Sequence, residues 1–441
     1  MTATAVLGAG ALGLTTALRL AQNGDRVTVL EREALPGGLA AGFEVSPGVW
    51  LEKFYHHLFR SDTHAIAMAE ESGLDQRLEW KTPVTATLHD GQLHQLDSPA
   101  SLLRFSPIPV VDRIRMGGAL AALKAMPTPH MLEGKTAAEW TKRWMGANAF
   151  EVVWEPLLRG KFGDAAPEIA MSWFWARVHD RTQSLGYIRG GFQQLYDWIA
   201  GEVRRLGGET RFGTVVTSVQ TDRGDLVVQT NDGIERFERV VSTLAPRLTA
   251  RLIPNLSATW RARYEWGRAY GAHCVVLALD RPLTSVYWLN VNDRGFPFMA
   301  LVEHTNYMSA ADYGNRHIVY LGNYRPMDDP LMRATQGEVL DSFLPHLSRI
   351  NAAFDESWVK QAWLFAAPFA QPIVTTEYRY HIPPLKTPVK NLWMANMFQV
   401  YPHDRGQNYS MALAERLVAR MLAEPSYSGD AQKRPSAQST K

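Results

Sequence analysis

Three glycines, Gly8, Gly10 and Gly13, follow a short apolar stretch at the start of the chain and constrain its fold more than any other feature. The stretch from Thr4 to Leu7 predicts a strand, and an amphipathic helix is expected from about Leu14 to Asn23. A strand, a glycine-rich turn and a helix form the first part of a β-α-β unit, whose crossover is right-handed by rule.

Each glycine has its own physical role in such a unit. Gly8 allows the tight turn, Gly10 lets the backbone approach a pyrophosphate, and Gly13 lets the helix pack closely on the strand. The N-terminus of the helix offers free N–H groups and a partial positive charge to the phosphates. A second strand, Arg26 to Glu31, ends on an acid that can accept hydrogen bonds from a ribose. The motif therefore predicts a dinucleotide site.

Composition narrows the remaining classes of protein. A chain of 441 residues is long enough for two domains, and its net charge of +2 gives no electrostatic argument for nucleic acid. The one cysteine, Cys274, excludes an intramolecular disulfide and a thiolate metal cluster, and its apolar neighbours predict a buried strand. No signal peptide is recognisable and no apolar run reaches the roughly 18 residues of a membrane span, so we expect a cytoplasmic protein.

A second glycine pair, Gly37 and Gly38, lies a few residues beyond Glu31. A site for NAD does not need it, whereas FAD carries a longer ribityl-isoalloxazine arm that must run past this loop. On these residues the chain resembles the flavin amine oxidase superfamily, which includes protoporphyrinogen oxidases, phytoene-desaturase-like enzymes and UDP-galactopyranose mutases. The resemblance implies an FAD-dependent oxidoreductase with an α/β fold, in which a Rossmann-like FAD-binding domain (GR2 type) is interleaved with a substrate domain made of a β-sheet and helices.

The resemblance continues along most of the chain. Residues 140–163 resemble the substrate-domain segment of protoporphyrinogen oxidases, and residues 187–195 resemble the Gly-Gly-aromatic segment of the superfamily. Val216 matches a valine whose backbone meets the adenine. Residues 392–396 and 404–410 resemble the closing FAD motif, where a helix N-terminus faces the flavin pyrimidine and stabilises negative charge on reduced flavin.

Two residues depart from the family pattern. Amine oxidases usually have arginine where this chain has Leu39, and glycine at about the place of Asn396. Both departures argue against a true amine oxidase but not against FAD.

The segment from Tyr55 to Asp62 contains two adjacent histidines, His56 and His57. UDP-galactopyranose mutases carry a similar stretch whose first histidine lies against the flavin, and His57 matches that position. Neighbouring residues of a strand point to opposite faces, so only one histidine is expected to meet the cofactor. His57 is predicted to contact the isoalloxazine or to exchange a proton near N5, and the alternative is a structural histidine bonded to a backbone carbonyl. No third ligand is suitably spaced for a metal site.

The resemblance thus predicts a cofactor site and places further candidates around it. The cofactor residues are Gly8, Gly10, Leu12, Gly13, Glu31, Arg32, Gly37, Gly38, Leu39, His57, Val216, Asn396, Asp404, Asn408, Tyr409 and Ser410. The catalytic candidates are His57, Tyr401 and His403, of which the last two precede the flavin-facing helix. The substrate candidates are Tyr287, Glu303 and Asn306 on predicted strands, for which a plain hydrogen-bond network is the alternative, and Arg159, which with Lys161 is suited to an anionic group or to solvated surface.

Hydrophobic periodicity and turn residues predict the remaining organisation. The FAD-binding domain is expected at residues 1–80, 185–265 and 385–423, the substrate domain at 81–184 and 266–384, and a disordered polar tail at 424–441. We expect helices at 65–80, within 98–180, at 190–207, 335–350 and 409–422, a hairpin at 84–97, strands at 214–219, 226–230, 237–243 and 392–396 with a turn at Asp232-Gly233, and a β-rich region at 270–325.

Residues 102–124 mix apolar side chains with four cations and predict either a segment on a membrane surface or an ordinary lid. There is no second GxGxxG motif before a helix, so we expect the substrate to reduce the flavin, and oxygen, a quinone or an electron carrier to reoxidise it. The leading hypothesis is hydride transfer from a bulky, largely apolar or lipid-like small molecule to flavin N5. The alternatives are a sugar-nucleotide isomerase like UDP-galactopyranose mutase, without net redox, and a flavin-stabilised scaffold without turnover.

Overall fold

The first strand of the chain, β1 (Ala3–Leu7), lies at the centre of a five-stranded parallel sheet. The structure, a computed structural model, describes residues 1–424. The strand order is β10-β2-β1-β14-β20, with β10 at Glu209–Arg211, β2 at Arg26–Leu30, β14 at Arg239–Ser242 and β20 at Leu392–Met394. Because all four pairings are parallel, the carboxyl ends of these strands meet at one edge of the sheet, where ligands of such folds bind.

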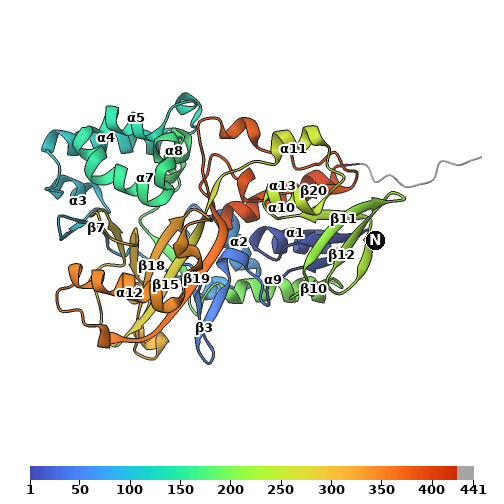
Figure 1. Cartoon of the computed structure of the whole chain (residues 1–441), viewed down its shortest axis with the longest axis horizontal. Coiled ribbons are helices and arrows are strands. Elements are labelled where there is room, and N and C mark those ends of the chain that lie inside the picture. The colour runs from blue at the N-terminus through green and yellow to red at the C-terminus, as the bar shows by residue number, and fades with distance from the viewer. Residues whose placement is uncertain (425–441) are drawn as a thin grey trace, which may run out of the picture.

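The crossover helix α1 (Ala11–Gln22) is almost wholly buried, because helices from distant parts of the chain pack against it. These are α9 (Gln193–Arg205) and α13 (Gln407–Leu422), which lie around α1 in the right-hand lobe of Figure 1. The helix begins three residues earlier than predicted, because Gly10 is its N-cap and Gly13 lies in its first turn. The predicted helices at 190–207 and 409–422 are confirmed, with small shifts at their ends.

A second, seven-stranded sheet forms the lower left lobe in Figure 1. Its order is β19-β15-β18-β17-β16-β7-β8, with β19 at Val359–Pro372, β15 at Ala269–Leu279, β18 at His317–Arg325, β17 at Ala300–Glu303, β16 at Trp288–Val291, β7 at Thr85–His89 and β8 at Gln92–Gln95. Alternate residues of β15 serve two cores. Val275 and Leu277 pack with the helix α12 (Gln336–Phe343), and Cys274 and Val276 face the core that the parallel sheet shares.

Helices between residues 99 and 179 form a third layer, the upper left lobe of Figure 1, as predicted. They are α3 (Pro99–Arg104), α4 (Val110–Ala125), α5 (Ala137–Met145), α6 (Ala147–Ala149), a π-helical turn (Phe150–Trp154), α7 (Glu155–Phe162) and α8 (Met171–His179). Their own core is built on large aromatic side chains such as Phe162, Trp173 and Phe174, which are fully buried.

Several element predictions are wrong in detail for identifiable reasons. The predicted helix at 65–80 is α2 (Thr63–Glu71) followed by a short 3-10 turn and the strand β6 (Leu78–Lys81), because Gly73 has φ 71° and ends the helix. The helix predicted at 335–350 stops at Phe343, where a proline enters the next turn and the chain continues as a 3-10 helix.

The strand predicted at 237–243 is two strands. β13 (Ile234–Phe237) pairs with β12 (Asp225–Thr230) across the predicted turn, whereas β14 joins the parallel sheet. β11 (Val216–Asp222) completes this small antiparallel sheet, and it begins two residues later and ends three residues later than predicted. The remaining short elements are β3 (Gly42–Ser46), β4 (Val49–Glu52), β5 (Leu58–Phe59), β9 (Leu185–Ile188), α10 (Pro246–Leu252) and α11 (Ala258–Tyr264).

The parallel sheet and the seven-stranded sheet each draw strands from several separated stretches of the chain, so the two parts are interleaved and the predicted fold class is confirmed. The domain boundaries remain a prediction. Of the predicted tail, residues 425–441 lie outside the described residues, while Glu424 is described and its carboxylate accepts a hydrogen bond of 2.6 Å from Lys386. Among residues 1–424, no helix combines the length and apolar character that crossing a membrane requires.

Candidate functional site

The glycine-rich loop lies at the carboxyl end of β1, and packing alone explains why two of its glycines cannot change. A Cβ atom added to Gly13 would lie 1.9 Å from the carbonyl oxygen of Gly8, and Gly8 itself has φ 103°. Gly10 differs, because nothing lies nearer to an added Cβ than the Cα of Gly38, at 4.0 Å. The backbone is therefore open at Gly10, where a phosphate group would have to approach.

The second glycine pair closes onto this loop. The amide of Gly37 donates a hydrogen bond of 2.8 Å to the carbonyl of Ala9. A Cβ on Gly38 would come within 3.1 Å of the Cα of Gly10, so only glycine allows the two loops to lie this close. The structure thus brings residues 8–13 and 37–38 together, as the resemblance implied.

The acid at the end of β2 also faces the loop. The carboxylate of Glu31 accepts hydrogen bonds from the amides of Ala9 (2.7 Å) and Glu33 (2.9 Å). The amide of Thr214 donates to the Glu31 carbonyl (2.8 Å), which brings the start of β11, with Val216, beside this acid. Arg32 instead projects from the loop and pairs with Glu33 in solvent.

These residues fit the adenosine and phosphate part of a dinucleotide. No side chain caps α1, so its first N–H groups are free for an anion. Leu12 is buried in that first turn. Asn396 follows β20 at the same edge of the sheet, and its Nδ2 atom is buried with no hydrogen-bond partner among the described residues. Such an orphaned donor needs a partner from outside the chain.

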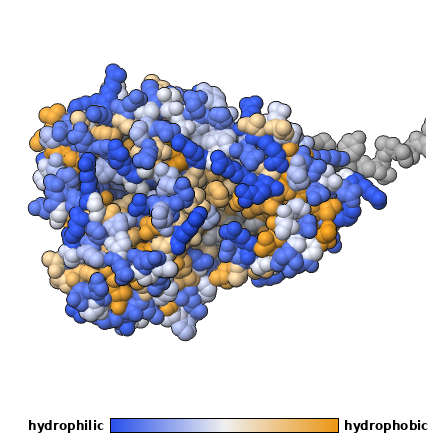
Figure 2. Space-filling model, viewed as in Figure 1, coloured by the Kyte–Doolittle hydropathy of each residue, from blue (hydrophilic) through white to orange (hydrophobic). Residues whose placement is uncertain are grey.

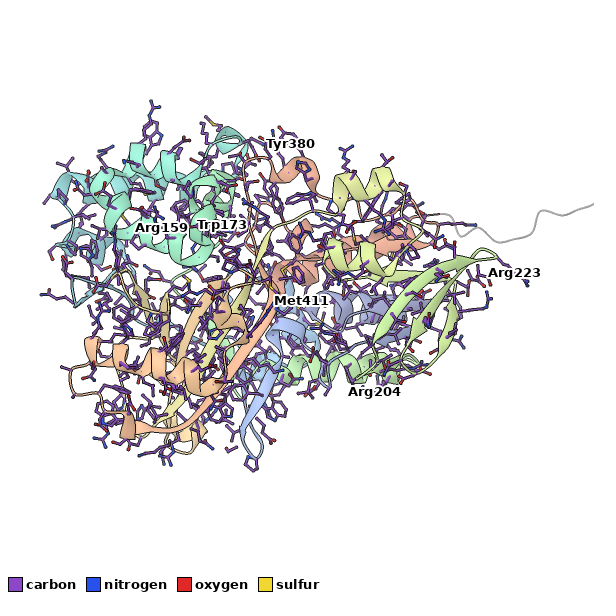
Figure 3. The ribbon with its side chains drawn as sticks, in the orientation of Figure 1. Arg159, Trp173, Arg204, Arg223, Tyr380 and Met411 are labelled. Carbon is purple, nitrogen blue, oxygen red and sulfur yellow. The ribbon has the colours of Figure 1, made fainter. Side chains whose placement is uncertain are left out.

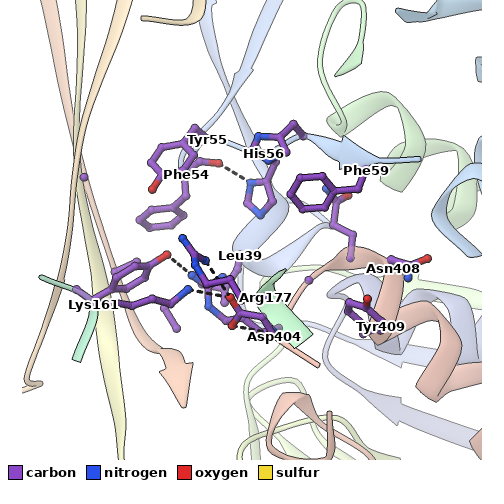
Figure 4. A pocket seen from close by; sticks show the side chains of 18 of the residues that line it. Leu39, Phe54, Tyr55, His56, Phe59, Lys161, Arg177, Asp404, Asn408 and Tyr409 are labelled. Carbon is purple, nitrogen blue, oxygen red and sulfur yellow. Dashed lines mark hydrogen bonds and ion pairs between the residues drawn. The ribbon is translucent and has the colours of Figure 1, made fainter. Parts of the chain in front are cut away.

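A pocket lies between Leu39 and the segment 54–62, the helical layer, the N-terminus of α13 and the seven-stranded sheet (Figure 4). The space in and around this pocket, including the open solvent at its mouth, measures about 1360 Å³. Leu39 and the residues around the N-terminus of α13 line one part of it, and that helix has no side-chain cap. The sheet contributes small residues, Ala272, Cys274 and Gly322, which leave space above its face. Burial raises the pKa of the Cys274 thiol, so it acts as the apolar residue that was predicted.

Both adjacent histidines line this pocket, although the sequence predicted that only one of them would meet the cofactor. The reason is that His56 and His57 lie in an irregular segment before β5, where side chains do not alternate as in a strand. Nδ1 of His56 bonds the carbonyl of Phe54 (2.5 Å), and Nδ1 of His57 lies 3.3 Å from the hydroxyl of Tyr287. Burial lowers the pKa of His57 to about 3 and that of His56 to about 4, so both are neutral near pH 7.

A cluster of charges forms the opposite wall, where Lys161 and Arg177 converge on Asp404 (Figure 4). Lys161 Nζ lies 2.9 Å and Arg177 Nη1 lies 3.5 Å from Asp404 Oδ2, and the Trp173 indole donates to Oδ1 at 3.1 Å. Burial alone would raise the pKa of Asp404, but Lys161, Arg177 and Arg405 outweigh it and hold that pKa well below its usual range. Burial lowers the pKa of Lys161 to about 7.

The other predicted residues near α13 occupy a separate network. Nδ1 of His403 lies 2.7 Å from Asp180 Oδ2, the same atom that the Tyr409 hydroxyl reaches at 2.7 Å, and the His403 and Tyr409 rings are stacked. Asp180 and Tyr409 line the pocket. Tyr401 points elsewhere, because its hydroxyl donates to Glu133 (2.9 Å) and bonds Ser172. A catalytic role for Tyr401 therefore has no support in the structure.

Two predicted cofactor residues of α13 have mainly local contacts. Asn408 lines the pocket, but its Oδ1 accepts from the amides of His64 (2.9 Å) and Ala65 (3.2 Å) and thereby fixes the start of α2. Ser410 is half-buried one turn into the helix and is not part of the pocket lining.

All four predicted substrate residues lie outside the pocket lining. Glu303 is buried, but its carboxylate accepts from the amides of Leu283 and Thr284, and the side-chain amide of Asn306 donates to the carbonyls of Thr284 and Val286. These side chains hold the loop before β16, so the plain hydrogen-bond network was the correct alternative. Tyr287 reaches the pocket only through His57.

For Arg159 the structure favours the second predicted alternative, a solvated surface position. Its side chain is 61% exposed on α7 and pairs with Glu155 in the same helix, whereas Lys161 is buried in the pocket wall. Figure 3 labels both Arg159 and Trp173 in the helical layer. Among the described residues, one group of possible metal ligands, His89, Asp90 and Asp293, lies at the β7–β8 turn, far along the sheet from the pocket.

Arg177, Arg181 and Tyr324 were missed by sequence reasoning, although all three line the pocket. The sequence does contain one sign of this site. Arg177 follows the mostly apolar stretch from Met171 to Ala176, so it is a cation on a helix that should be buried. A charged residue on a buried helix needs a partner, which is a reason to expect a site there.

The fold and these two regions define a class of protein: an α/β protein with a dinucleotide loop at the edge of its parallel sheet and a pocket beside it. The model of the flavin containing amine oxidoreductase family matches residues 13–403, and the chain belongs to that family.

Curated relatives match short segments. A 15-cis-phytoene desaturase from Synechococcus elongatus is 31% identical over 101 residues, which are 23% of this chain and 20% of the relative. A second, from Glycine max, is 27% identical over 154 residues, 31% of this chain and 27% of the relative. The chain thus spans about a quarter of the length of the relatives it matches.

Solved structures match the whole fold at low identity. A reduced UDP-galactopyranose mutase has a TM-score of 0.76 at 14% identity and covers 96% of each chain. A protein from Exiguobacterium sp. 255-15, provisionally named a protoporphyrinogen oxidase, has 0.75 at 16%, with 95% of this chain and 98% of that chain covered. A putrescine oxidase with bound putrescine has 0.71 at 16%, with 96% and 99% covered. At this identity the likeness concerns the fold alone.

Proposed function

We propose that the flavin of this chain is FAD and that it oxidises an organic substrate bound in the pocket. FAD, when bound, accepts a hydride at its N5 atom. The observation that carries the proposal is the position of the pocket. Leu39 and the N-terminus of α13 line one side of it, and small residues of the seven-stranded sheet line another. The adenosine end would lie on the glycine loop and Glu31, with Asn396 as a further donor.

The protein would contribute positioning, exclusion of water and charge. Tyr55 and Trp288 are packed edge to face at 4.8 Å beside His57, and such aromatic walls hold a substrate in one orientation. His57 is neutral, so it can donate or accept a hydrogen bond without carrying charge. The uncapped N-terminus of α13 would supply a partial positive charge that stabilises the negative charge of a reduced flavin.

The test is anaerobic mixing of the purified flavoprotein with candidate amines, polyprenoids and porphyrinogens. A substrate of this enzyme bleaches the long-wavelength flavin band, and admitting oxygen, a quinone or an electron carrier restores it. Absence of bleaching with every class would refute substrate oxidation. Denaturation and mass spectrometry of the released flavin identify it as FAD or FMN independently of any substrate.

A second candidate function is a sugar-nucleotide isomerisation without net redox, as the name of one structural neighbour suggests. Two observations favour it: the paired histidines in the pocket and the basic cluster opposite them. This reaction would require flavin that has been reduced with dithionite beforehand, whereas the oxidation requires oxidised flavin. The two functions are therefore separated by the redox state in which turnover occurs.

We propose further that the helical layer touches a membrane surface. Leu103, Val110, Val111 and Ile114 are exposed large apolar residues at the start of α4 and the end of α3, and Arg104 and Arg115 are exposed between them. Figure 2 shows hydrophobic surface at the left edge of the molecule, where these helices lie. Apolar side chains flanked by arginines suit the surface of an anionic bilayer.

A further inference from the structure

The charged wall of the pocket holds more positive than negative charge. Lys161, Arg177 and Arg405 come from α7, α8 and the loop before α13, and they surround one carboxylate, that of Asp404. Arg405 is held by Gln371 at 3.2 Å and by the hydroxyl of Tyr324. Buried cations are normally paired with anions, so this cluster lacks a partner of negative charge.

Neither of the other two carboxylates that line the pocket is free to supply that charge. Asp180 accepts hydrogen bonds from Tyr409 and is paired with His403 and His179. Asp62 accepts the amide of Phe59 at 2.9 Å, beside β5. Arg181, whose side chain is exposed at the pocket, adds a fourth cation rather than removing one.

The geometry of the cluster suits an anionic group with several oxygens. Lys161 is 6% exposed and Arg177 is only slightly exposed, so water screens them little. Guanidinium groups bind carboxylate and phosphate through two parallel hydrogen bonds, and a lysine adds a point charge. Phe54, Tyr55 and Trp288 also line the pocket and supply an aromatic surface, next to polar residues such as His56 and Asn323.

We propose that the substrate of this enzyme is an amphipathic acid, whose phosphate or carboxylate binds at Lys161, Arg177 and Arg405 and whose apolar body lies against the aromatic wall. This inference rests on the proposed function, because it assumes that the pocket is the substrate site. It revises the expectation of a largely apolar substrate by adding an acidic end to it. The binding step needs no redox event, so it can be tested without turnover.

The test uses the flavin-loaded protein and three probes of one shape, 1-naphthyl phosphate, 1-naphthoate and 1-naphthol, titrated by calorimetry and by the change in flavin absorbance. One or both acids should bind at least about tenfold more tightly than the alcohol, the loss typical of one charge-assisted hydrogen bond. The acid that binds more tightly indicates whether the site prefers a phosphate or a carboxylate. Equal affinity for all three probes would overturn the proposal.

Variants locate the site. Arg177→Gln should weaken the acids about tenfold or more and leave the alcohol unchanged, while Arg159→Gln, in the neighbouring helix but solvent-exposed, should change neither. If Arg177→Gln does not fold, Lys161→Gln and competition by inorganic phosphate in the wild type test the same cluster. A variant that shifts the flavin potential without changing acid binding would assign the cluster to the flavin and refute the inference.

The outcomes also separate this inference from the proposed oxidation. If the acids bind at the cluster but no substrate bleaches the flavin, the oxidation fails and the acid site stands. If the flavin is bleached only by neutral or cationic compounds that naphthyl phosphate does not displace, the oxidation stands and the acid site fails.

Discussion

The Nζ atom of Lys161 lies 2.9 Å from Oδ2 of Asp404, although 243 positions separate the two residues in the chain. This ion pair joins the helical layer to the loop that leads into α13, so it ties the pocket wall to the end of the cofactor domain. Asp404 is the sole carboxylate among the described residues that the cations of this cluster share.

Replacing this carboxylate should destabilise the fold. Asp404→Asn leaves Lys161 and Arg177 buried without their counter-charge, and loss of one partner of a buried pair costs about 3–5 kcal/mol. Because the Asp404 side chain is 22% exposed, we expect the lower part of that range in urea unfolding at neutral pH. Glu155→Gln breaks the exposed pair with Arg159 and is the matched control, with less than about 1 kcal/mol expected. Equal effects of the two changes would contradict the role of the buried pair.

The glycine loop yields a prediction for cofactor content. In Gly13→Ala the new methyl group would lie 1.9 Å from the Gly8 carbonyl oxygen, so the loop must shift. Its N–H groups would then no longer point toward the phosphates. The purified variant should carry less than about a tenth of the wild-type flavin, as the ratio of flavin to protein absorbance measures. Gly118→Ala in α4 is the control, because nothing lies within 4 Å of its added Cβ. Full flavin content in Gly13→Ala would remove this loop from the cofactor site.

The cofactor loop could be predicted because its parts are close in sequence. Glycines, helix start and ribose acid all fall between residues 4 and 38, where local turn geometry and hydrophobic period dictate the structure. The closing segment required the family resemblance, since residues 392–410 have no pattern of their own that indicates a flavin.

The charged cluster could not be predicted, because it exists only after distant helices pack. Arg159 and Lys161 are two positions apart on α7, which places them on different sides of a helix with about 3.6 residues per turn. One of the two side chains had to face away from the pocket, and the sequence does not indicate which one. The same applies to Glu303, whose partners lie in a loop twenty residues earlier.

The pH dependence of acid binding follows from Lys161. Burial lowers the pKa of this lysine to about 7, so it is cationic below that pH and increasingly neutral above it. The affinity for 1-naphthyl phosphate should therefore fall as the pH rises through about 7, after correction for the ionisation of the probe itself. In Lys161→Gln this dependence should be absent. An affinity that is constant or rising over the same interval in the wild type would contradict the assignment.

His57 should remain neutral throughout the physiological range. Burial lowers its pKa to about 3, with Arg181 acting in the same direction. Nitrogen-detected NMR of the imidazole should therefore show no titration of His57 between about pH 5 and pH 8, and the resonance is assigned by its loss in His57→Gln. Tyr287→Phe removes the hydroxyl 3.3 Å from Nδ1 and should shift that signal without restoring titration. A midpoint near 6.5 would mean that the ring is hydrated rather than enclosed.

The apolar start of α4 provides the test of membrane contact. Val111 and Ile114 are 66% and 62% exposed, and replacing both with serine should leave the fold unchanged because neither packs in a core. We expect the wild-type protein to sediment with vesicles of anionic phosphatidylglycerol and to be released by salt, since the flanking arginines contribute about 1 kcal/mol each near such a surface. The double variant should bind at least about tenfold more weakly. Ile234→Ser on β13, which removes an equally exposed residue (67%) from the opposite lobe, should have no effect. Equal loss in both variants, or no sedimentation of the wild type, would show that this face is an ordinary surface over the pocket.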